Sequence, residues 1–364
     1  MVQRKTEIIV VGMLALCAAC SRSNTSTSSV NERPIGQTIE IKVPLGLPAV
    51  PIPADNPPTA DAIALGRRLF YDKMLSVDAT LACASCHNPK LGFSDASKHS
   101  SVVGGKTGTR NAPTVINAAY APLQFWDGRA PTLEDQAGGP IANPVEMNQS
   151  HDVCVSKLGS TPEYKAAFEK VFGPGPVTIG KVEKAIASFE RTVLSGNSPF
   201  DRYEYGGDKT AMTPAALRGM ELFRDKDKAN CVTCHTIDAK FALFTDGKFH
   251  NIGVGVDGEG ELTDLGRYKE TKAERDKGAF KTPTLRNIAL SAPYMHDGSI
   301  KTLKGVVDFY AGGGNSNPTL DKEMKSLQLS GLERMDLVAF LESLTGEIPA
   351  DTGPPPATQV GQVK

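Results

Sequence analysis

Two short motifs hold the residues whose types and spacing most clearly predict chemistry. Both follow the pattern C-x-x-C-H, and they consist of Cys83, Cys86 and His87 in one half of the chain and Cys231, Cys234 and His235 in the other. In this pattern the two thiols add to the vinyl groups of a haem, and the adjacent histidine reaches the iron. A zinc site and a thioredoxin-like redox site are the alternatives, but a histidine in the same place twice fits haem better. The motifs therefore predict two covalently bound c-type haems.

A repeat surrounds the two motifs. The segment 66–72 (GRRLFYD) precedes the first and the segment 219–225 (GMELFRD) precedes the second. Downstream, Pro113-Thr114 matches Pro283-Thr284, and Asp127-Gly128 matches Asp297-Gly298, both at an offset of 170, whereas the haem motifs are offset by 148. The difference is an insertion of 22 residues after the second haem motif. We therefore predict two homologous haem domains, over residues 55–205 and 206–348.

The elements that must position these motifs have helical patterns. Thr178 precedes an apolar stripe at helical spacing, Thr213-Pro214 is typical of a helix start, and residues 330–333 (SGLE) form a capping box. No sustained alternation of apolar and polar residues predicts a strand. The expected fold is all-α, with long loops around the haems.

Composition excludes two broad classes of protein. The chain has 364 residues, with 40 Lys+Arg against 41 Asp+Glu, and a net charge of -1 excludes a nucleic-acid partner. A mean hydropathy of -0.23, with one apolar run near membrane length, excludes a polytopic membrane protein.

That apolar run belongs to an export signal. Arg4 and Lys5 precede it and Ala18-Ala19-Cys20 follows it, so residues 1–20 are predicted to be a lipoprotein-type signal peptide, although Cys17 stands where Leu is usual. Plain secretion and an uncleaved anchor are the alternatives. Residues 21–54 are predicted to be a flexible tether and residues 349–364 a flexible tail. We expect a periplasmic protein that meets the membrane only through a lipid anchor, on the outer membrane because Ser21 follows Cys20.

Beyond the haem motifs, the chain resembles the bacterial dihaem cytochrome c peroxidases, and most closely the MauG-type branch. Residues 65–72, 110–114, 125–130, 134–137, 143–147, 285–287 and 292–298 carry the resemblance together with the haem motifs. It spans roughly residues 55–346. It implies two cytochrome c-like domains related by duplication, with the peroxidatic haem in the N-terminal one and the electron-transfer haem in the C-terminal one.

The resemblance also implies the second iron ligands. The C-terminal haem takes a Met in typical peroxidases, and Tyr310 occupies that position here, as in the MauG-type branch. A phenolate donates charge to iron and depresses its reduction potential. The N-terminal haem of typical peroxidases has a removable His, and Val103 occupies its position. That haem is therefore expected to have an open face, unless His99 replaces the missing ligand.

Family positions counted from Trp126 imply the catalytic groups. Glu146 is the expected acid–base group, Gln136 orients bound peroxide, and Trp126 relays electrons between the haems. Asn111 and the main-chain carbonyls of Ser291 and Pro293 match the family's ligands for one Ca²⁺. His296 is expected to be a second-shell or haem-propionate partner, and Cys154 to be buried and inert.

Two functions follow from these residues. The first is a dihaem peroxidase that reduces hydrogen peroxide with electrons from a small cytochrome c or cupredoxin. Its Tyr310 and Val103 favour a MauG-like variant, in which high-valent haem oxidises a partner protein. The second is a dihaem electron-transfer cytochrome without peroxidase activity, which has no use for Glu146 or Gln136.

Overall fold

The structure, a computed structural model, describes residue 1 and residues 32–356. Residues 31–364 form one compact unit, the second of two into which the chain divides, and only this second unit is considered below. The predicted signal peptide with Cys17 and Cys20 lies outside the described residues. Within the described part, no helix is both long enough and apolar enough to cross a membrane.

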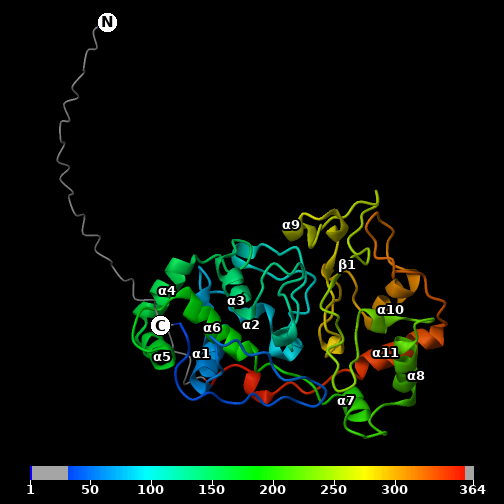
Figure 1. The fold of residues 1–364 in the computed structure, drawn as a ribbon, viewed down its shortest axis with the longest axis horizontal. Coiled ribbons are helices and arrows are strands. Elements are labelled where there is room, and N and C mark those ends of the chain that lie inside the picture. Colours follow the sequence, from blue (N-terminus) through cyan, green and yellow to red (C-terminus); the bar gives the residue numbers. More distant parts are fainter. Residues whose placement is uncertain (2–31, 357–364) are drawn as a thin grey trace. The chain divides into compact units, whose positions relative to one another are not determined.

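The second unit is built mainly of helices, which confirms the predicted all-α class (Figure 1). The helices are α1 (Ala60–Phe70), α2 (Cys83–Cys86), α3 (Leu133–Ala142), α4 (His151–Ser160), α5 (Pro162–Phe172), α6 (Ile179–Glu190), α7 (Pro199–Glu204), α8 (Pro214–Arg224), α9 (Tyr268–Thr271), α10 (Leu303–Gly312) and α11 (Gly331–Glu342). Two short strands, β1 (Phe249–His250) and β2 (Phe280–Lys281), pair antiparallel. Long loops and short 3₁₀ turns join these elements.

The repeated segment before each haem motif makes the same helix crossing twice. Gly66 in α1 lies against α6, where an added Cβ would be 1.8 Å from the Ala185 carbonyl oxygen. Gly219 in α8 lies against α11, where it would be 1.9 Å from the Asp336 carbonyl oxygen. Only glycine allows these approaches. The repeat is therefore a physical duplication of one helix pair.

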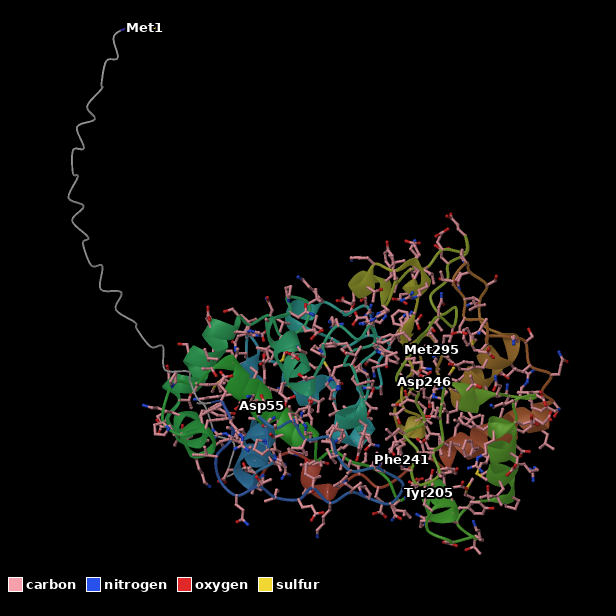
Figure 2. All side chains as sticks on the ribbon, in the orientation of Figure 1. Met1, Asp55, Tyr205, Phe241, Asp246 and Met295 are labelled. Atoms are coloured by element: carbon pink, nitrogen blue, oxygen red, sulfur yellow. The ribbon has the colours of Figure 1, made fainter. Side chains whose placement is uncertain are left out.

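Each crossing anchors its own hydrophobic core. Phe70 packs on Phe189 with ring centroids 5.2 Å apart, and the equivalent Phe223 packs on Phe340 at 4.9 Å. The first core comprises buried residues between Ala62 and Val193, and the second those between Phe200 and Leu344. Figure 2 shows side chains filling both halves. Two cores agree with two haem domains, and the exact boundary at 205/206 stays a prediction.

The predicted tether is wrong over residues 32–54. Ile35 donates its N–H to the Val171 carbonyl in the first half, and the Gly46 carbonyl accepts from Arg286 in the second half at 2.6 Å. Leu47 is buried. The Ser/Thr-rich composition of residues 21–31 does not extend into this segment, whose main-chain groups pair with both halves.

The predicted flexible tail is likewise wrong over residues 349–356. Thr352 is buried, and its carbonyl accepts a hydrogen bond from the Tyr71 hydroxyl at 2.8 Å. Arg67 donates to the Gly353 carbonyl at 2.6 Å. The remaining residues of the tail, 357–364, lie outside the described part.

The glycine at the second helix crossing can be tested by substitution. Gly219→Ala is expected to lower the free energy of unfolding by about 1–3 kcal/mol, because the new methyl group meets a main-chain oxygen that cannot retreat easily. Denaturant titration followed by haem absorbance measures the loss.

Gly331→Ala is the matched control, since no atom lies within 4 Å of its added Cβ at the start of α11. It should leave stability unchanged or raise it slightly. Equal stability of the Gly219 and Gly331 variants would contradict the close crossing.

Candidate functional site: two haem pockets and their interface

The second C-x-x-C-H motif opens onto a large cavity. It has a volume of about 630 Å³, within the range of roughly 300–1,000 Å³ usual for cofactor pockets, and Cys231, Cys234, His235 and Tyr310 line it. The Nδ1 of His235 lies 2.8 Å from the Phe244 carbonyl oxygen, which leaves Nε2 for a metal. These residues fit a covalently attached haem.

The first motif has the same arrangement. Helix α2 begins at Cys83 and ends at Cys86, and His87 is its C-cap residue. The Nδ1 of His87 lies 3.2 Å from the Phe93 carbonyl oxygen. Burial lowers the pKa of both His87 and His235, so each imidazole is neutral at pH 7, as a metal ligand must be.

Tyr310 reaches the C-terminal cavity from helix α10. Burial raises the pKa of its phenol, and the neighbouring Cys231 and Cys234 act in the same direction. A phenolate at this place therefore requires a cation beside it, and the iron of a bound haem would be such a cation.

Glu146 is held in a turn by Asn143. The Asn143 side-chain oxygen accepts from the Val145 N–H at 3.1 Å, and its amide donates to Glu146 Oε1 at 3.0 Å. Burial raises the pKa of the Glu146 carboxyl, against the opposing effects of Arg129 and Asn143. Sequence reasoning assigned no role to Asn143, although an Asn-Pro-x-Glu turn signals such an arrangement.

Glu146 is joined to the residue at the missing-ligand position. Its carbonyl accepts the Val103 N–H at 3.1 Å, so the two main chains lie next to each other. The charge of Glu146 also makes a small contribution to the raised pKa of Cys83 and Cys86, for which burial is the largest cause. The structure thus brings Glu146 and Val103 together, in the same half as the first motif.

Gln136 lies on helix α3 and is half-buried. Its main-chain N–H donates to the Thr132 carbonyl, and its side chain makes no hydrogen bond with any described residue. The structure therefore leaves its amide free, without bringing it into contact with Glu146.

Trp126 lies where the two halves meet. Its indole N–H donates to the Asn111 carbonyl at 2.9 Å, and its own carbonyl accepts the Lys281 N–H at 2.9 Å. Its ring lies edge-on to that of His296, with centroids 6.5 Å apart. Its position is thus set by residues from both halves.

The offset of 170 makes this interface internally symmetric. Asn111 corresponds to Lys281, and Trp126 corresponds to His296. Asn111 N–H donates to the His296 carbonyl at 2.7 Å, just as Lys281 N–H donates to the Trp126 carbonyl. Equivalent positions therefore exchange equivalent hydrogen bonds across the interface. The repeat was visible in the sequence, but this exchange was not.

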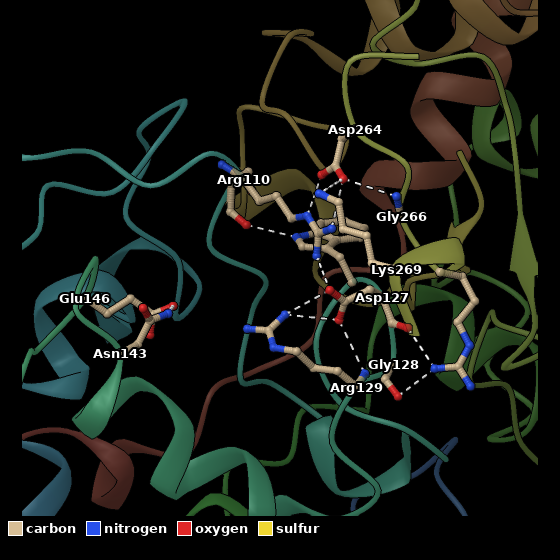
Figure 3. A network of polar contacts seen from close by, with 12 residues as sticks. Arg110, Asp127, Gly128, Arg129, Asn143, Glu146, Asp264, Gly266 and Lys269 are labelled. Atoms are coloured by element: carbon tan, nitrogen blue, oxygen red, sulfur yellow. Dashed lines mark hydrogen bonds and ion pairs between the residues drawn. The ribbon is translucent and has the colours of Figure 1, made fainter. Parts of the chain in front are cut away.

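The inserted segment of the second half adds an ionic contact. Arg110 donates to both oxygens of Asp264, at 2.7 and 3.1 Å, and to Asp127 at 2.6 Å (Figure 3). Arg129 also pairs with Asp127, and Lys269 with Asp264. These pairs hold the loop that contains Trp126 and Asp127 against the segment of the second half that contains Asp264 and Lys269.

Oxygen atoms suited to a hard cation also face the cavity. Asn111 uses its side-chain N–H₂ on the Ser97 carbonyl, so its side-chain oxygen remains available. Ser291 and Pro293 line the same cavity, and their carbonyls accept no main-chain hydrogen bond from the described residues. No cluster of three His, Cys, Asp or Glu side chains is found within residues 32–356. The remaining oxygens are the type that Ca²⁺ prefers.

Three other side chains of interest are buried or paired. His296 stacks on Phe280 with centroids 3.5 Å apart, and burial lowers its pKa to about 4. His250 bridges Asp321 and Asp246, the latter labelled in Figure 2. Cys154 is fully buried and burial raises the pKa of its thiol to about 11, which agrees with the expected inert role.

A double-mutant cycle tests the ionic contact between the halves. Arg110→Leu and Asp264→Asn should each destabilise the protein and show a coupling energy of about 1–3 kcal/mol, because both side chains are largely buried. Thermal or denaturant unfolding measures the cycle. The exposed pair Lys170–Asp61 serves as control, with a coupling near zero to about 1 kcal/mol. Equal coupling in both pairs would contradict the proposed contribution of Arg110.

Comparisons with known proteins match both halves. A family model for di-haem cytochrome c peroxidase matches residues 60–210, and a cytochrome c model matches residues 216–345. The methylamine utilization protein MauG of Methylorubrum extorquens is 39% identical over 349 residues, covering 95% of this chain and 95% of that protein. Cytochrome-c peroxidase IdrP1 of Denitromonas iodatirespirans is 37% identical over 360 residues, covering 91% of this chain and 92% of that protein.

A solved structure shows the same likeness. The crystal structure of a MauG-like protein associated with microbial copper homeostasis matches with a TM-score of 0.77 and 31% identity. The match covers 89% of this chain and 99% of that chain.

Proposed function

Because the chain belongs to the dihaem cytochrome c peroxidase and MauG family of oxidoreductases and carries two c-type haems, we propose that it reduces hydrogen peroxide to water. The electrons come from a small cytochrome c or cupredoxin. The observation that carries this proposal is the half-buried Glu146 carboxyl, which Asn143 holds in a turn whose Glu146 carbonyl binds the Val103 N–H. An electron carrier has no need for a positioned acid there.

Glu146 moves the proton in this proposal. Reduction of one peroxide to two waters consumes two electrons and two protons, and a bound haem supplies the redox chemistry that breaks the oxygen–oxygen bond. Glu146 accepts a proton from one peroxide oxygen and returns it to the leaving oxygen. The free amide of Gln136 orients the peroxide. The isopropyl group of Val103 cannot bind iron, so the coordination position that a His would occupy stays open for the peroxide.

Tyr310 and Val103 favour a second, MauG-like outcome for the oxidising equivalents. An anionic oxygen ligand stabilises oxidised iron, so the C-terminal haem is suited to hold one equivalent while Trp126 connects it to the other haem. The equivalents are then used on an aromatic side chain of a partner protein. MauG of Methylorubrum extorquens, one of the relatives, is named for methylamine utilization.

We also propose one Ca²⁺ at the interface, bound by the Asn111 side chain and the Ser291 and Pro293 carbonyls. Three unengaged oxygens lining one cavity support it. The export signal over residues 1–20 supports a periplasmic location with a lipid anchor at Cys20 on the outer membrane.

Glu146→Gln tests the acid–base role. Peroxide turnover should fall by roughly 10²–10⁴-fold, the usual effect of losing a general base. In the native enzyme the carboxylate is the active form and its pKa is raised, so turnover should fall with decreasing pH at a midpoint above the ordinary value of 4.5. Asn143→Leu removes a hydrogen bond that lowers this pKa, so its midpoint should lie at still higher pH.

The exposed Glu163 on α5 provides the control for this experiment. Glu163→Gln should leave both the rate and the pH profile unchanged. Full turnover in the Glu146→Gln protein would remove this residue from the mechanism, and an absence of peroxide turnover in the native protein would favour the electron-transfer cytochrome.

Tyr310→Phe tests the storage of oxidising equivalents. After one equivalent of peroxide, the native protein should accumulate a two-electron-oxidised state, visible in near-infrared absorbance and Mössbauer spectra, and the variant should not. Tyr294→Phe, which alters a different tyrosine of the same cavity, is the control and should retain the state. Survival of that state in the Tyr310 variant would show that the phenol is not required.

A further inference from the structure

Lys281 is the one position of the symmetric interface whose side chain has no partner among the described residues. Its repeat counterpart Asn111 donates to Ser97, Trp126 donates to Asn111, and His296 stacks on Phe280. The Lys281 ammonium makes no ion pair or side-chain hydrogen bond with any described residue, and burial lowers its pKa to about 8.

The backbone of Lys281 is fixed, which limits the region that its side chain can reach. Its N–H is bound by the Trp126 carbonyl, and strand β2 pairs it with Phe249 of β1. The side chain lines the same cavity as Cys231 and Cys234. An unpaired ammonium in such a place costs free energy unless an anion joins it.

The two ends of the cavity differ in character. Cys231 packs against the second hydrophobic core, whereas Lys281 lies at the interface with the first half. A haem bound by its vinyl groups carries its two propionate carboxylates on the opposite edge of the ring. The other lysines of the cavity, Lys226, Lys228 and Lys325, are exposed at the surface. Lys281 is thus the one lysine of this cavity that is not exposed, and among the described residues its ammonium has no partner.

We propose that the Lys281 ammonium binds a propionate carboxylate of the C-terminal haem at the interface, next to Trp126. This contact pairs the half-buried Lys281 ammonium with an anion, and it places a positive charge beside the haem. A nearby positive charge favours the reduced form of the iron and so raises its reduction potential. The inference requires only the haem at Cys231 and Cys234, and it holds whether or not peroxide is the substrate.

Potentiometric titration of the haem-loaded protein tests the contact. Lys281→Met should lower the reduction potential of the C-terminal haem. Lys281→Arg should keep this potential close to the native value because the positive charge remains. A variant lacking both Cys231 and Cys234 identifies which potential belongs to which haem. Resonance Raman spectra should show a shifted propionate-bending band in the Lys281→Met protein.

Lys248 provides the matched control. It is exposed, and its carbonyl accepts the N–H of Thr282, the residue after Lys281. Lys248→Met should change neither the potentials nor the Raman band. An unchanged C-terminal potential in Lys281→Met, a shift confined to the N-terminal haem, an equal shift in Lys248→Met, or an unchanged propionate band would each overturn the proposal. None of these readouts uses peroxide, so their failure is separate from failure of the proposed activity.

Discussion

The exchange of main-chain hydrogen bonds between equivalent positions is the constraint on which the rest of this structure depends. Asn111 binds the carbonyl of His296, and Lys281 binds the carbonyl of Trp126. Each bond joins one copy of the repeat to the other. Because both bonds come from the backbone, the register of the two halves is fixed independently of side-chain identity, and a one-residue slip would break both.

A symmetric backbone with different side chains explains how duplication produced two unlike sites. Arg110 corresponds to Phe280, and across the interface the guanidinium of Arg110 lies 5.3 Å from the ring centroid of Phe280. The loop after the second haem motif then supplies Asp264, which pairs with Arg110. Arg110 therefore has ionic partners in both halves, Asp127 and Asp264.

The sequence predicted the parts of this molecule that depend on local pattern. Gly66 and Gly219 occupy the same place in the repeated segment that the sequence shows. Because neither residue has a Cβ, another helix can cross closely at each of them. The tether failed as a prediction because the composition of residues 21–31 was extended to residues 32–54. The pairing of Gly46 with Arg286 joins residues 240 positions apart, and no local pattern reveals it. Asn143 was missed for a different reason: its Asn-Pro-x-Glu turn is a local signal, but the hydrogen bond to Glu146 depends on a side-chain orientation.

Burial favours the neutral form of the ionisable groups at both haem sites, but these groups are of different kinds. Beside the first motif, burial raises the pKa of Glu146, which prepares a carboxyl group to exchange protons. Beside the second, Tyr310 and Lys281 are ionisable groups that burial drives toward their neutral forms, and only a bound cation or anion restores their charge. The first site is thus suited to proton transfer and the second to holding charge. In the proposed function, Trp126, which is held by both halves, connects those two tasks.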